Sequence, residues 1–192
     1  MNRLLIASLA LAALLLGACC QQDASGVAKP GKQELSVQTV ATQAKGFTVG
    51  SMMSAHTVYV FFDPQCPHCG HLWQASTPLH NKIKFVWIPV AWINASSLPQ
   101  GAALLTAANP TELMTAHEAS LLAKQGGITA PASVAPDIEQ AIKANTKLLK
   151  SFGAESVPFV VTQDARTGQS TGRDGAMNTA DLAVLAGVDA TP

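Results

Sequence analysis

The sequence contains few charged residues and no concentration of them. Only 12% of its 192 residues are charged, with 12 basic and 12 acidic side chains and a formal net charge of zero. No cluster of Lys or Arg occurs along the chain, which argues against a nucleic-acid-binding surface. The chain also lacks internal repeats, and a hydrophobic content of 48% excludes an intrinsically disordered protein. We therefore expect one domain with a substantial core.

Cysteine is also scarce, and two of the 4 copies, Cys19 and Cys20, close an N-terminal segment. This segment has a single basic residue, Arg3, followed by an apolar run of about 13 residues, which is too short to span a bilayer and is typical of a signal peptide. Its end, Leu16-Gly17-Ala18-Cys19, resembles the lipoprotein box of bacteria. We expect a signal peptide over residues 1–18 and a lipid on Cys19; the alternative is a plain secretory signal with an incidental cysteine.

A lipid on Cys19 would anchor the domain to a bacterial membrane from the periplasm, an oxidising compartment. Cys20 follows it where an aspartate would resemble an inner-membrane retention signal, so the sequence favours the outer membrane. The polar residues 19–47 then predict a tether, with a short strand near residues 35–40. The remaining residues, 48–192, are expected to form the catalytic domain.

The pattern of that domain predicts an α/β fold. A β-branched and aromatic strand over residues 56–63 ends at Pro64, a helix begins near Pro67, and a second buried strand covers residues 82–92. This order implies two parallel neighbouring strands joined by a right-handed crossover. A helical insertion over about residues 98–152 follows, with expected helices over residues 98–108, 109–127 and 136–152. A hairpin over residues 157–175 and a helix from Asn178 complete the domain.

The remaining two cysteines form the sequence Cys66-Pro67-His68-Cys69, between the first strand and the first helix. A zinc site needs a second pair of ligands, and the domain has no third cysteine; the haem pattern fails because Gly70 follows Cys69. A purely structural disulfide would close a very short loop and remove little chain entropy. The position predicts a redox centre instead, with no metal and no cofactor.

The helix start explains the chemistry expected of each residue in this centre. The sulfur of Cys66 would face unpaired backbone N–H groups and the positive end of the helix dipole, which favour the thiolate, the attacking form of cysteine. His68 can donate a hydrogen bond to that thiolate or add positive charge. Cys69, one turn further along, is expected to be the buried resolving thiol.

Three stretches, "YVFFDPQCPHCGHLW", "KFVWIPVAW" and "LLKSFGAESVPFVV", resemble the periplasmic thiol:disulfide interchange proteins of the DsbC and DsbG family. The resemblance implies a thioredoxin-like fold, with a central mixed sheet flanked by helices and the helical insertion. It also implies that Pro158 is a cis-proline which, with Val157 before it, docks the substrate backbone opposite the two cysteines.

The sequence departs from the family in three respects. The long N-terminal dimerisation domain is missing, which puts the family's dimer in doubt. Val157 stands where the family has Thr and, like Pro67-His68, resembles the DsbA oxidases. Val60 occupies the position, six residues before Cys66, at which many thioredoxin-fold proteins bury an acid; Asp63 is nearer, and we expect it to cap the helix.

These features favour an exported thiol:disulfide oxidoreductase of the reductase or isomerase type. Its substrates would be cysteine-containing proteins of the cell envelope, and a DsbD-like membrane protein would keep it reduced. One alternative is a DsbA-like oxidase recharged by a DsbB-like partner. Others are a copper carrier that uses Cys66, Cys69 and a nearby Met or His, and a tethered scaffold in which the disulfide serves no catalytic purpose.

Overall fold

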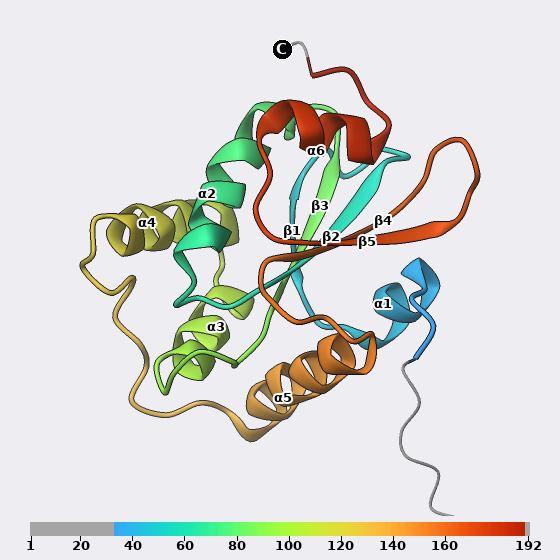
Figure 1. Cartoon of the computed structure of the whole chain (residues 1–192). Coiled ribbons are helices and arrows are strands. Elements are labelled where there is room, and N and C mark those ends of the chain that lie inside the picture. Colours follow the sequence, from blue (N-terminus) through green and yellow to red (C-terminus); the bar gives the residue numbers. More distant parts are fainter. Residues whose placement is uncertain (1–32, 191–192) are drawn as a thin grey trace, which may run out of the picture.

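The structure, a computed structural model, describes residues 33–190. It contains both strands and helices along the chain (Figure 1). The strands are β1 (Phe47–Gly50), β2 (Thr57–Phe62), β3 (Lys84–Pro89), β4 (Phe159–Gln163) and β5 (Ser170–Asp174). The helices are α1 (Val37–Gln43), α2 (Pro67–Ser76), α3 (Ser97–Leu105), α4 (Pro110–Leu122), α5 (Pro136–Ser151) and α6 (Thr179–Ala186), with a short 3-10 turn, η1 (Thr77–Leu79), after α2.

The five strands form one mixed sheet in the order β1-β3-β2-β4-β5. β2 and β3 are parallel and α2 connects them, which confirms the predicted pair of parallel neighbouring strands. The other three pairings are antiparallel, and Val60 of β2 lies opposite Val160 of β4. β2 is therefore central, and the chain leaves it directly toward Cys66.

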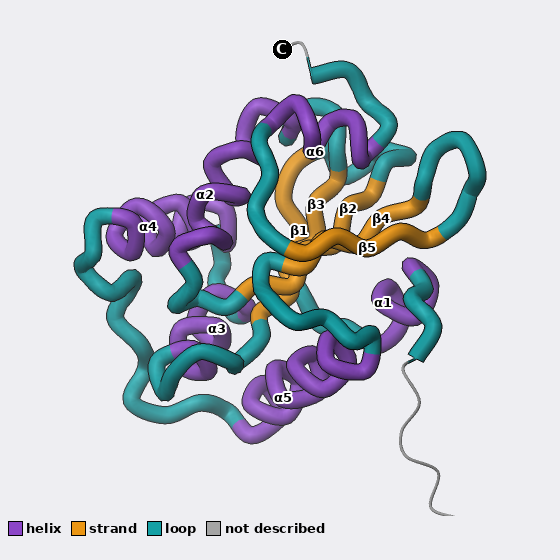
Figure 2. The backbone as a smooth tube through the Cα atoms, viewed as in Figure 1, coloured by secondary structure: helices purple, strands orange, loops and turns teal. Residues whose placement is uncertain are grey.

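Helices cover both faces of the sheet, as the tube through the backbone shows (Figure 2). Side chains alternate along β2, so that Val58, Val60 and Phe62 join one core with α2, α4 and α6. Phe61 points to the opposite face and joins the second core with α1 and α5. The two cysteines belong to the first core and are buried in the packed interior.

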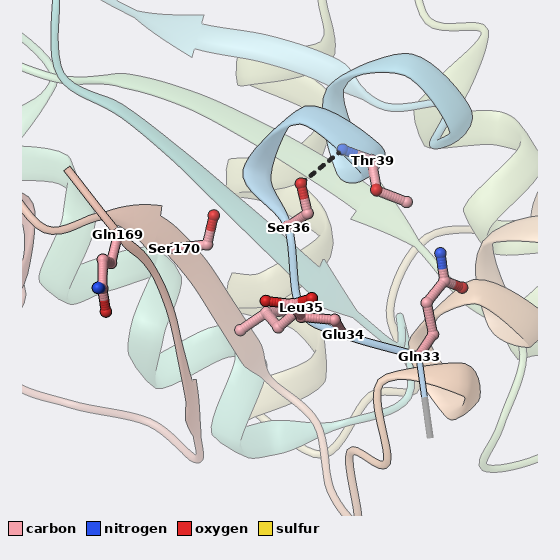
Figure 3. A pocket seen from close by; sticks show the side chains of 7 residues that line it. All are labelled: Gln33, Glu34, Leu35, Ser36, Thr39, Gln169 and Ser170. Atoms are coloured by element: carbon pink, nitrogen blue, oxygen red, sulfur yellow. Dashed lines mark hydrogen bonds between the residues drawn. The ribbon is translucent and has the colours of Figure 1, made fainter. Parts of the chain in front are cut away.

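The N-terminal part of the fold differs from the prediction. The expected strand near residues 35–40 is wrong, because α1 begins at Val37, capped by the Ser36 side chain, which accepts from the Thr39 backbone N–H. Val40 is fully buried, so the described part of the expected tether packs on the domain. Figure 3 shows the hollow in front of α1, which includes Ser170 of β5; the Ser170 hydroxyl accepts from the Val37 backbone N–H at 2.9 Å.

The helical insertion matches the prediction closely. α4 and α5 lie within their expected ranges, and α3 begins one residue before its expected start. The expected cap of α4 is present: the Asn109 side chain accepts from the backbone N–H of Glu112. α4 packs against α2, and this contact places the insertion next to the cysteine motif.

Within residues 33–190, no helix is both long and apolar enough to cross a membrane. The expected signal peptide and the lipidation site, Cys19, lie outside the described residues. They remain predictions from the sequence.

Candidate active site

Cys66 occupies the N-cap position of α2, and Pro67 is the first residue of the helix. Proline is accommodated there because the first helical N–H has no partner within the helix. No side chain caps this helix end, and the backbone N–H groups of His68 and Cys69 interact with the Cys66 thiolate. Cys66 is 4% exposed and Cys69 is fully buried, and both thiols are free.

The loop before β4 faces the Cys66 sulfur. The peptide bond between Val157 and Pro158 is cis, as the family resemblance predicted. The thiol of Cys66 donates a hydrogen bond to the backbone carbonyl of Val157 at 3.3 Å. β4 pairs with β2, so the sheet itself fixes the distance between this loop and the cysteines.

The two thiols differ in acidity. The pKa of Cys66 falls to about 7, chiefly because the Cys69 thiol donates a hydrogen bond to the Cys66 thiolate. Burial opposes this shift, while the backbone N–H groups of Cys69 and His68 and the charge of His68 support it. Burial raises the pKa of Cys69 well above its usual value, and its bond to Cys66 adds to this. The pair therefore combines a nucleophile with a protonated partner.

The histidines near the motif do not converge on one point. His68 and His71 are exposed on α2, with ring centroids 6.4 Å apart. His80 packs against Trp73 and Phe85 instead. Across residues 33–190, no group of three or more His, Cys, Asp or Glu side chains has the arrangement of a metal site.

Asp63 does not cap α2, so this expectation was wrong. Its carboxylate is fully buried and accepts four hydrogen bonds. The donors are the backbone N–H groups of Gln65, Trp92 and Ile93 and the hydroxyl of Ser97. Asp63 thus fastens the loop after β3 to the segment that leads into the cysteines.

The insertion contributes two buried residues that the sequence did not single out as part of the site. His117 accepts at Nδ1 from the backbone N–H of Ile128, so Nε2 carries the proton that it donates to the carbonyl of Pro64 at 2.7 Å. Burial lowers the pKa of His117, which favours this neutral form. The next residue, Glu118, is 1% exposed, and burial raises its pKa to about 9.

Comparison with known proteins finds relatives that are named thiol:disulfide interchange proteins. The chain is 27% identical over 140 residues to the thiol:disulfide interchange protein DsbG of Pseudomonas aeruginosa, a match that covers 72% of this chain and 54% of the relative. It is 32% identical over 108 residues to DsbG of Escherichia coli, covering 54% of this chain and 42% of the relative. The chain thus spans about half the length of these curated relatives. No protein-family model matches the sequence.

Among solved structures, a periplasmic thioredoxin-like protein from Salmonella enterica serovar Typhimurium superposes with a TM-score of 0.63 at 16% identity. The match covers 81% of this chain and 97% of that structure, which shows the fold. The domain therefore has the predicted thioredoxin-like fold, and the chain is similar in sequence to the thiol:disulfide interchange proteins named DsbG, as the sequence resemblance predicted.

Proposed function

We propose that this chain is a periplasmic thiol:disulfide oxidoreductase of the reductase or isomerase type. Cys66 attacks a disulfide of a substrate protein and forms a mixed disulfide. Cys69 then attacks the sulfur of Cys66 and releases the reduced substrate. Val157 and Pro158 dock the substrate backbone beside the reacting sulfur, and Pro67 and His68 set the environment of the thiolate.

The acidity of Cys66 supports electron flow from the two cysteines to the substrate disulfide. A pKa of about 7 leaves about half of Cys66 as thiolate at neutral pH. It is close to that of thioredoxin, about 7, and far from that of DsbA, about 3.5. Each pKa unit of thiolate stabilisation below the ambient pH corresponds to about 1.4 kcal/mol, or about 30 mV for this two-electron couple. The reduced form therefore lacks roughly 100 mV of the stabilisation that makes a DsbA-type disulfide oxidising.

The test is the equilibrium reduction potential of the Cys66–Cys69 couple against glutathione. We expect a value nearer the roughly −270 mV of thioredoxin than the roughly −120 mV of DsbA. A potential near the DsbA value, together with a mostly oxidised pool in cells, would overturn the reductase assignment. A Cys66→Ser variant gives the baseline in a coupled insulin-reduction assay.

The alternative of a DsbA-like oxidase rests on Pro67-His68 and on Val157, which resemble that group. A DsbD-like reductant would serve the first function and a DsbB-like oxidant the second. Trapping the mixed disulfide of a Cys69→Ala variant in cells identifies both the envelope substrates and the membrane partner.

We further propose that the chain is anchored by a lipid on Cys19, at the outer membrane. Labelling with a radioactive fatty acid and membrane fractionation of a Cys19→Ser variant test the anchor. A copper carrier is the remaining alternative from a different class, with Cys66 and Cys69 as soft ligands. Stoichiometric copper in the purified protein, without insulin-reduction turnover, would favour it.

A further inference from the structure

Glu118 is a buried acid at the contact between α4 and α2. Its side chain is 1% exposed, and neither carboxylate oxygen has a hydrogen-bond partner among residues 33–190. Burying an unpaired carboxylate is so unfavourable that such a group normally binds a proton instead. The carboxyl group of Glu118 therefore stores a proton in the interior of the folded chain.

This carboxyl group lies against the part of α2 that carries the resolving cysteine. A Cβ atom placed on Gly70, the residue after Cys69, would lie only 2.7 Å from Oε2 of Glu118. Glycine at this position is what lets the carboxyl group approach the α2 backbone. The charge of Glu118 also acts on the Cys69 thiol, and that of Cys66 acts on Glu118.

Among the titratable groups on the elements that pack around Glu118, the thiols of Cys66 and Cys69 are placed to exchange a proton with it. From α2 and its N-cap these groups are Cys66 and Cys69, which are buried, and His68 and His71, which are exposed. On α4 itself, His117 is committed to Pro64 and Ile128 through both ring nitrogens, and Glu112 is exposed. α3 and β1, which also contact α4, contain no titratable side chain.

The acid that many thioredoxin-fold proteins bury on the strand before the motif is replaced by Val60, which is fully buried here. We propose, on the basis of the thiol–disulfide exchange proposed above, that Glu118 takes its place and is the proton donor and acceptor for Cys69. The acid comes from the helical insertion rather than from the sheet. The Val157 carbonyl accepts from Cys66, whereas Glu118 lies against Gly70, the residue after Cys69.

The proton has a defined path in each direction. When an incoming thiolate attacks Cys66 in the disulfide form, the bond between Cys66 and Cys69 breaks, and a new bond joins Cys66 to the incoming sulfur. The electron pair goes to the Cys69 sulfur, which takes the proton of Glu118, and the carboxylate regains a proton from solvent. In the reverse direction, Glu118 first releases its proton to solvent, and its carboxylate then accepts the Cys69 proton as Cys69 attacks Cys66 and the partner leaves as thiolate.

Cys69 needs such a donor because it is fully buried. Burial raises its pKa well above the usual value, so a bare thiolate is an unfavourable leaving group there. Positioned acids and bases typically accelerate proton transfer by about 10²–10⁴-fold. The negative charge of the Cys66 thiolate is one cause of the raised pKa of Glu118. When Cys66 is held in a disulfide, this charge is gone, so Glu118 gives up its proton more readily.

The test measures the reaction of the oxidised protein with dithiothreitol from pH 5 to 10, with each rate divided by the thiolate concentration of the reagent. For the wild type we expect a constant value that declines above about pH 8, as Glu118 loses its proton. Glu118→Gln keeps the shape but cannot transfer the proton, so its rate at pH 7 should fall at least about tenfold, with no decline at high pH. Glu112→Gln, at an exposed position of the same helix, should match the wild type.

A wild-type profile without the decline, or a Glu118→Gln profile that coincides with it, would overturn the proposal. The wild-type measurement decides the question even if Glu118→Gln fails to fold. An oxidised wild type that does not react with dithiothreitol, or a purified protein that forms no disulfide between Cys66 and Cys69, would instead contradict the proposed function. The two failures are therefore distinguishable.

Discussion

The hydrogen bond from the Cys69 thiol is the largest contribution that lowers the pKa of Cys66 to about 7. Cys69→Ala removes it and leaves the backbone N–H groups of α2 in place. A hydrogen bond to a charged group contributes about 1.5–3 kcal/mol, and one pKa unit corresponds to about 1.4 kcal/mol. We therefore expect the pKa of Cys66 to rise by about 1–2 units in this variant.

The pKa must be measured directly, because reaction rates hide most of this change. At pH 7 the thiolate fraction would fall from about one half to roughly 1–9%. A more basic thiolate is also a better nucleophile, with a Brønsted coefficient of about 0.4–0.5. Alkylation at pH 7 would then slow only about two- to sixfold. The ultraviolet absorbance of the thiolate, followed against pH, reports the pKa itself.

Cys69→Ser is the matched control, because its hydroxyl group can still donate to the Cys66 thiolate. We expect its Cys66 pKa to lie within about half a unit of the wild-type value. Equal pKa values in the alanine and serine variants, both above the wild type, would mean that the sulfur itself is needed. An unchanged pKa in Cys69→Ala would refute the reasoning and assign the acidity to the helix N-terminus.

Two further predictions concern stability. Alanine at Gly127 would bring its Cβ into a clash with Cε1 of His117, whereas alanine at Gly126 meets no atom within 4 Å. The backbone angle φ is +84 at Gly127 and +85 at Gly126, so both substitutions share a backbone cost of about 1–2 kcal/mol. In urea unfolding, Gly127→Ala should lose at least about 1 kcal/mol more, and equal losses would contradict the contact. The pKa of Glu118 is about 9 in the folded chain and 4.5 for a free side chain. Between these pH values the folded chain binds more protons than the unfolded chain, so the free energy of unfolding falls as pH rises. Glu118→Gln should therefore be more stable than the wild type at pH 8, by up to about 5 kcal/mol, and should lose this advantage near pH 4.5; a difference independent of pH would contradict the buried acid.

Local patterns were enough to predict the elements that carry the cysteines. The β-branched run ending at Pro64, and Pro67 in the first turn, mark the end of β2 and the start of α2 without any tertiary information. The cis peptide before Pro158 followed from the family resemblance. α1 was mistaken for a strand because Val37 and Val40 are β-branched, and packing of the buried Val40 overrides that preference.

The two residues that α4 adds to the site had no comparable signal in the sequence. In the expected helix over residues 109–127, His117 and Glu118 read as ordinary polar positions. Their burial depends on which face of α4 meets α2, a contact between segments about 50 residues apart. Gly70, directly after Cys69, was the one local hint, because a missing Cβ permits close approach of another element.

α4 contacts the site on both sides of the cysteine motif, and this arrangement links the insertion to the chemistry. Through His117 it holds the carbonyl of Pro64, before Cys66, and through Glu118 it reaches the backbone after Cys69. The first contact fixes the loop that positions the nucleophile, and the second supplies a group that can exchange a proton with the buried thiol. A displacement of α4 would therefore change the geometry of one cysteine and the proton supply of the other together. The insertion is thus the part of the fold through which the reactivity of this site can differ from that of a thioredoxin domain without it.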